Sequence, residues 1–381
     1  MPLGVVAFLV SIAYVPWWSG AAITPRWAIM AVGAAVLICG TKTAPPRSIT
    51  RADALGVAFV AYCALSVAWS PVFVEAADEL MKLGILALLF VVGRSVSSLL
   101  SAYIGFGAGM TVNSVIMIVE RVAYGVETQG IGINPEFGGV ALPHVGLFFN
   151  PNFAAESAAV VVVALAMSRL WWLVLGVWPT LVLAGSRGAI LGLLAAACGY
   201  LAPRSRLGAF ALATAGIVGV VLAFMLANRS TAGISDRLHI WTDTLSGLTL
   251  FGHGIGSYWV TFPQFATFDV NLSRPDHAHN DALELSYELG IGAVCAAWLV
   301  IELLRYANET ERLAIIAFLA IGLAGFPLHL PATAFLFAVM AGHAARGSVP
   351  VRLPFMLRRT GIFGPVQQQA DRLSHDPAPL R

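Results

Sequence analysis

Long apolar runs separated by short polar segments follow one another almost from end to end of the chain. Many of these runs approach the roughly 20 residues that an α-helix needs to cross a bilayer. The pattern predicts an all-α, polytopic integral membrane protein with about 12 transmembrane helices and a helical outer loop between spans 9 and 10. The predicted spans are 2–17, 27–41, 53–69, 80–93, 98–119, 153–168, 170–185, 188–202, 208–227, 281–303, 313–327 and 332–345.

Composition agrees with this prediction. Hydrophobic residues make up 58% of the chain and charged residues 11%, and the mean hydropathy is +0.81, whereas a soluble domain needs a charged surface. The net charge of +2, with scattered basic residues, gives no basis for binding nucleic acid. The four cysteines all lie in apolar runs without metal-ligand spacing, which is typical of small buried residues.

Most short loops that carry arginine or lysine fall on one side of the predicted membrane, and they place both termini in the cytoplasm. We therefore expect a single transmembrane domain over 1–346 and a disordered cytoplasmic tail over 347–381. Two long outer segments, about 120–152 and 228–280, would lie on the opposite, outer side of the membrane. Loops of this length usually carry function.

The second outer segment ends in "RPDHAHNDALELSYELG", the densest group of polar residues in the chain. His277, Asp281, Glu284 and Glu288 are spaced by four, three and four residues, which would place them along one stripe of a helix. A carboxylate in a membrane helix is costly, so such a stripe should face protein or a hydrated cavity, with His279 and Asn280 at its mouth. The alternative is that these groups only cap the helix.

Two arginines stand near other predicted spans. Arg187 lies between apolar runs in "LVLAGSRGAILGLL", and Arg237 precedes Trp241 by four residues in a short amphipathic segment. Guanidinium groups bind phosphate oxygens through paired, charge-assisted hydrogen bonds, so two or three arginines suit a diphosphate. The alternative for Arg187 is a loop arginine whose side chain reaches the headgroups, and the alternative for Arg237 is a surface charge.

The combination of outer arginines, a histidine and lipid suggests transfer from a lipid-linked diphosphate to a hydroxyl group, because histidine commonly accepts such a proton near neutral pH. A metal site at His277, His279 and Asp281 is the competing interpretation. It is disfavoured because residues i and i+2 diverge on a helix. The glycines at 252, 254 and 256 follow no strand pattern, so they are weak evidence for a nucleotide.

These motifs resemble the O-antigen ligase and O-antigen polymerase superfamily of bacterial envelope glycosyltransferases. The resemblance covers a motif-bearing core of about 145–300. It rests on "FFNPNFAA" at 148–155, "GSRGA" at 185–189, "RLHIWTDTL" at 237–245, "FGHGIGSY" at 251–258 and "HAHNDALELSYELGIGA" at 277–293.

The resemblance implies a metal-independent, inverting glycosyltransferase without a cofactor, which takes its donor glycan from undecaprenyl diphosphate. Arg187 and Arg237 match the diphosphate-binding arginines, and His279 matches the base that activates the acceptor hydroxyl. The supporting candidates are His277, Asn280, Glu284, Arg229 and Arg274.

The motifs suit both a ligase, which would transfer the glycan to lipid A-core in lipopolysaccharide biosynthesis, and a polymerase, which would extend the polysaccharide. We favour the ligase, because HAHN and the paired arginines fit its pattern. A lipid-glycan transporter or flippase is the rival from another class, since about 12 spans is also a common transporter layout. It predicts charges near mid-membrane in both halves of the chain.

Overall fold

The computed structural model describes residues 2–13, 25–40, 48–124, 146–148, 150–208, 210–214, 216, 232–270 and 275–351. Within these ranges the named elements are all helices, which agrees with the predicted all-α class. The N-terminal part contains α1 (Pro2–Ile12), α2 (Pro25–Gly40), α3 (Arg51–Ser66), η1 (Val67–Trp69), α4 (Phe73–Ser95), α5 (Leu100–Tyr124), α6 (Pro151–Met167), α7 (Trp171–Ala184) and α8 (Arg187–Leu201). The C-terminal part contains α10 (Ala232–Ser246), α11 (Tyr258–Thr261), η3 (Phe262–Gln264), α12 (Asp281–Leu289), α13 (Gly292–Tyr306), α14 (Glu309–Gly322) and α15 (Pro331–Ala345).

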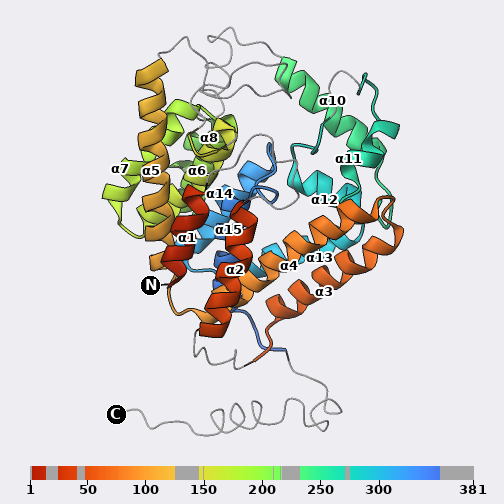
Figure 1. Cartoon of the computed structure of the whole chain (residues 1–381), viewed down its shortest axis with the longest axis horizontal. Coiled ribbons are helices and arrows are strands. Elements are labelled where there is room, and N and C mark those ends of the chain that lie inside the picture. The colour runs from red at the N-terminus through yellow and green to blue at the C-terminus, as the bar shows by residue number, and fades with distance from the viewer. Residues whose placement is uncertain are drawn as a thin grey trace, which may run out of the picture.

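The centre of the core is formed by α6, α14 and α15, whose residues are mostly buried. The run AAVVVVALA in α6 is apolar on every face, as expected of a helix enclosed by others. Around this centre α1 packs on α5, α5 on α7, α8 on α14 and α4 on α15. Figure 1 shows α5 to α8 on one side and the inclined helices α3, α4 and α13 on the other, with α10 and α11 above them.

Small residues allow the close approach of α4 and α15. A Cβ atom at Gly93 of α4 would collide with the backbone of Val339, and one at Gly342 of α15 would collide with the backbone of Phe90. Small residues at such crossings are characteristic of helices that associate by packing backbone against backbone. The packing of α15 on α4 also places His329, just before α15, 3.7 Å from Glu79 of α4.

Two helical segments, Arg51–Trp69 and Leu100–Ala123, are long and apolar enough to cross a membrane by length and composition. The described part also has six shorter apolar helices of 10–17 residues. The structure therefore contains helices near the predicted spans, but their lengths do not establish about 12 crossings. Large apolar side chains are exposed on several of these helices, among them Trp172 and Leu175 on α7 and Val57 on α3.

The predicted span 281–303 is divided into two helices. Gly290 adopts a φ of 53° at the end of α12, and the N–H of Ile291 leaves the helical pattern to bond the carbonyl of Leu250 at 2.8 Å. Since a positive φ is easily adopted only by glycine, this residue breaks the helix and α13 begins in a new direction. At the other end of the domain, Val351 N–H bonds the carbonyl of Ile49 at 2.8 Å, and the rest of the predicted tail, 352–381, lies outside the described residues.

Candidate active site

Helix α12 begins at Asp281 because Asn280 caps it. Asn280 has an extended backbone, and its side-chain oxygen accepts a hydrogen bond from Leu283 N–H at 3.1 Å. His277 and His279 therefore precede the helix, and the predicted helical stripe starts at Asp281, not at His277. His279 has a φ of 52°, in the left-handed region that non-glycine residues rarely adopt.

The segment before α12 is held through Ala278, which is fully buried. Its N–H donates to Oε2 of Glu284 at 2.8 Å, and its carbonyl accepts from the indole N–H of Trp241 at 2.9 Å. The other oxygen of Glu284 lies 2.8 Å from Nδ1 of His277. The Glu284 carboxylate thus fixes two consecutive residues directly before His279.

The two arginines come from different helices. Arg187 is the first residue of α8, after a tight turn in which Gly185 has a φ of 59° and the hydroxyl of Ser186 caps the helix. Arg237 is on α10, and its Nη1 donates to the carbonyl of Ala324 at 2.8 Å. The segment after α14 therefore contacts α10.

Electrostatic interactions link His279, Arg237 and Arg187. Burial, and after it the positive charge of Arg237, lower the pKa of His279 to about 4. Burial also lowers the pKa of Arg237; the charge of Glu156 opposes this, and the charge of Arg187 adds to it. The His279 imidazole is consequently neutral at physiological pH, and the guanidinium of Arg237 near it would attract an anion.

The sequence analysis did not identify Glu156, a buried residue of α6. Methyl groups added to Gly188, directly after Arg187, or to Gly325, directly after Ala324, would each lie 3.1 Å from its Oε1. The carboxylate therefore lies between the segment that begins with Arg187 and the segment that binds Arg237. A carboxylate within the apolar run FAAESAAV was the available sign of this position.

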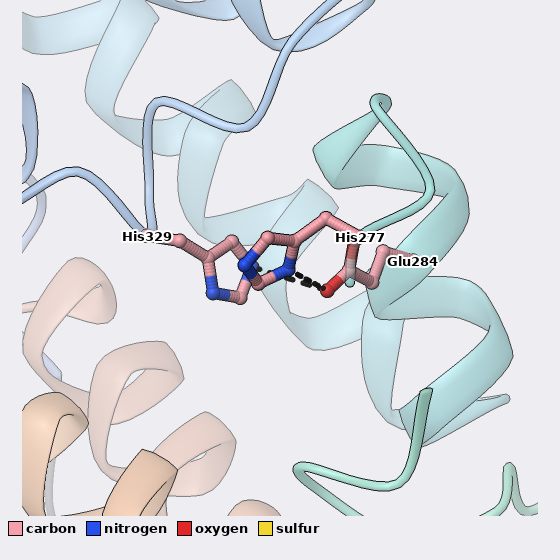
Figure 2. Close-up of side chains that lie close together, drawn as sticks. All are labelled: His277, Glu284 and His329. Carbon is pink, nitrogen blue, oxygen red and sulfur yellow. Dashed lines mark hydrogen bonds and ion pairs between the residues drawn. The ribbon is translucent and has the colours of Figure 1, made fainter. Parts of the chain in front are cut away.

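His329, which lies between α14 and α15, was also missed. Its Nε2 lies 3.5 Å from Oε1 of Glu284, and its ring faces that of His277 at 4.3 Å (Figure 2). On its other side, Nδ1 of His329 lies 3.7 Å from Oε2 of Glu79 on α4. A lone histidine in PLHLP, about 50 residues after HAHN, carries no spacing signal that would connect the two.

His277, Glu284 and His329 have potential metal-ligand atoms within 4.8 Å of one another. The two imidazole rings face each other at 4.3 Å with 36° between their planes. Nδ1 of His277 is already engaged by Glu284 at 2.8 Å. These residues form a cluster of carboxylate and imidazole groups joined by a hydrogen bond and ion-pair contacts.

The glycine run has a structural role. All three glycines, at 252, 254 and 256, have a positive φ. A Cβ on the first would collide with the backbone of α12, on the second with the backbone directly after η1, and on the third with the backbone of α4. The N–H groups of Gly256 and Tyr258 donate to the carboxylate of Glu288 at 3.0 and 2.9 Å. Because this carboxylate occupies both N–H groups, the run does not form a phosphate cradle, and Glu288 anchors the segment to α12.

The structure thus brings His279 and Arg237 together, with Arg187 close enough to influence Arg237 electrostatically. His277, Asn280 and Glu284 lie directly around His279. Arg229 and Arg274 lie outside the described residues. No protein-family model matches the chain, and no curated protein is significantly similar to it in sequence.

Proposed function

We propose that this protein is a membrane glycosyltransferase of the O-antigen ligase type. It would transfer a glycan from undecaprenyl diphosphate to a hydroxyl group of lipid A-core, at the outer face of the bacterial inner membrane. The observation that carries the proposal is the placement of His279 and Arg237 on one segment: His279 packs on Phe326, Arg237 donates to Ala324 two residues before it, and the charge of Arg187 acts in turn on Arg237. A base close to an anion-binding group suits a reaction that removes a proton and releases a diphosphate.

In the proposed reaction the acceptor oxygen attacks the anomeric carbon from the face opposite the diphosphate. The carbon–oxygen bond to the diphosphate breaks as the new glycosidic bond forms, so the configuration is inverted. The hydroxyl proton passes to the neutral imidazole of His279. The electron pair of the broken bond leaves with undecaprenyl diphosphate, whose growing negative charge Arg187 and Arg237 stabilise.

Exposed apolar surface supports a membrane location for this chemistry. Trp171, Trp172, Leu175 and Trp178 of α7 are each at least half exposed, and contiguous apolar surface of this kind is typical of contact with lipid or another protein. The tryptophans would lie at the headgroup level, where amphipathic rings are favoured. We accordingly propose a multi-pass protein whose bilayer lipids are its first partners.

A transfer assay tests the proposal. Purified protein in detergent would receive an undecaprenyl-diphosphate oligosaccharide and either lipid A-core or a second lipid-linked oligosaccharide, with a chelator present. Mass spectrometry would identify the product. We expect lipid A-core to gain the glycan. Extension of the second donor instead would identify a polymerase that uses the same site, and no transfer to either acceptor would contradict the proposal.

A transporter of lipid-linked glycans is the second candidate function. One observation favours it: Glu79 and Lys82 of α4, in the first half of the chain, join the His329 cluster from the second half. Chains of carboxylates and histidines between helices occur in transporters that relay protons. A transporter would move labelled donor across a vesicle membrane without changing its mass, which separates the two functions.

A further inference from the structure

His279 occupies a strained position. A left-handed backbone conformation costs a non-glycine residue on the order of 1 kcal/mol and persists only where the surroundings fix it. The residue before it supplies this restraint, because Ala278 is fully buried and both of its backbone polar groups are bonded to side chains. Leaving either group unpaired in the interior would cost about 1–3 kcal/mol, so the two side chains strongly define the path of the chain.

We infer that Trp241 and Glu284 are positioning residues that set the place of the His279 imidazole relative to Arg237. This inference rests on the proposed function, in which His279 is the base and Arg237 binds the donor diphosphate. Trp241 acts through the carbonyl of Ala278, and Glu284 acts through its N–H.

Trp241 links the base to the diphosphate site through a single helix. Arg237 and Trp241 are four residues apart on α10, so they lie on the same face, one turn from each other. Arg237 donates to Ala324, while Trp241 donates to Ala278, the neighbour of His279. The distance between the anion-binding group and the base is thus set by one helical turn and one hydrogen bond. This accounts for the spacing in RLHIW.

The segment after α14 provides a second connection between α10 and α12. The ring of Phe326, two residues after Ala324, packs against the ring of His279 at 5.2 Å between centroids. Leu328 N–H in the same segment donates to Asp281 of α12 at 3.1 Å. The segment that accepts the Arg237 hydrogen bond therefore also contacts the base and the helix that follows it, so α10 and α12 are held together on both sides of His279.

Trp241→Phe tests the inference, because it keeps an aromatic ring and removes the donor to Ala278 together with a part of the indole. We expect kcat for glycan transfer to fall about 10- to 100-fold, as expected when a base is displaced by a fraction of an ångström, while KM for the donor stays within about threefold. Binding of inorganic pyrophosphate, which probes the arginines alone, should not change. Trp298→Phe, an exposed position on α13, is the matched control and should transfer at the wild-type rate.

Glu284→Gln and Glu284→Ala form the second pair of variants. Gln retains an oxygen that accepts from Ala278 N–H, whereas Ala leaves that N–H unpaired, so we expect Gln to preserve much more of kcat than Ala when both variants are assayed well below their melting temperatures. This pair keeps the inference testable if Trp241→Phe does not fold. Wild-type kcat in Trp241→Phe, or equal losses in the two Glu284 variants, would overturn the positioning role.

The proposed function has a separate control in the same experiment. If His279→Ala transfers glycan at the wild-type rate, the assignment of the base is wrong. If His279→Ala is inactive while Trp241→Phe retains wild-type kcat, the base assignment stands and only the positioning role fails. A lower melting temperature of Trp241→Phe is expected in either case, because the Ala278 carbonyl loses its donor. A purely structural effect of Trp241 would raise the donor KM together with the fall in kcat, and that result would also overturn the inference.

Discussion

Nδ1 of His277, which directly precedes α12, lies 2.8 Å from Oε1 of Glu284, which is in the first turn of that helix. Burial alone would lower the pKa of His277, but the charge of Glu284 and their hydrogen bond raise it to about 9. The folded state therefore binds this proton more tightly than the unfolded state, in which the pKa is about 6.5. The resulting stabilisation is complete below about pH 6.5 and is lost as the pH rises through about 9.

The first prediction concerns this pH dependence. The difference in unfolding free energy between wild type and His277→Gln should be on the order of 2 kcal/mol below pH 6.5 and should vanish above about pH 9. Thermal unfolding in detergent would be measured for both proteins from pH 5.5 to 10. Subtracting the two unfolding free energies at each pH cancels the contributions of the other titrating groups. A difference that grows with rising pH would contradict the assignment.

The pH dependence of activity is the second prediction. Because burial and then the charge of Arg237 lower the pKa of His279 to about 4, the base is already deprotonated at neutral pH. We expect kcat/KM to be nearly constant from pH 8 to pH 5 and to fall as the pH drops through about 4. Arg237→Gln removes one cause of the lowered pKa, so its acidic limb should move to higher pH.

Arg237→Lys is the control for this shift. It preserves the positive charge, so the acidic limb should stay near the wild-type position even though the paired hydrogen bonds to the donor are weakened. Identical acidic limbs in the Gln and Lys variants would show that Arg237 does not act on His279 electrostatically.

The glycine run provides the third prediction. Gly254 has a φ of 94°, and a Cβ there would lie 2.6 Å from Cα of Ser70. Gly254→Ala should therefore destabilise the protein by at least about 2 kcal/mol, through backbone strain and collision together. Gly84→Ala in α4 is the matched control, since no atom lies within 4 Å of its added methyl group. It should unfold at the wild-type temperature or slightly above, because alanine favours a helix.

The sequence predicted the positions of most described helices, because apolar runs bounded by Arg, Pro, Gly and Asn define where a helix begins and ends. It predicted α6 and α15 closely, at 153–168 and 332–345 against the observed Pro151–Met167 and Pro331–Ala345. It did not predict the break at Gly290, because a single glycine within an apolar run is compatible with a continuous helix.

The site could be predicted in part. Residues adjacent in sequence, such as His277, His279 and Asn280, were identified because polar groups are costly in an apolar chain. Glu156 and His329 depend on contacts made by distant segments, so local patterns did not reveal them. The roles of Glu284 and Glu288 also required geometry. Glu284 binds His277 and Ala278, and Glu288 binds the N–H groups of Gly256 and Tyr258 at the start of α11.

The most direct test of the central claim is the rate of glycan transfer to lipid A-core in a single turnover, compared between His279→Ala and His239→Ala. His239 is an exposed histidine on α10 and serves as the matched control. We predict that the His279 variant loses at least about 100-fold in rate, as expected for loss of a general base, and that the His239 variant matches wild type. Equal rates in the three proteins, or no transfer by wild type, would contradict the account.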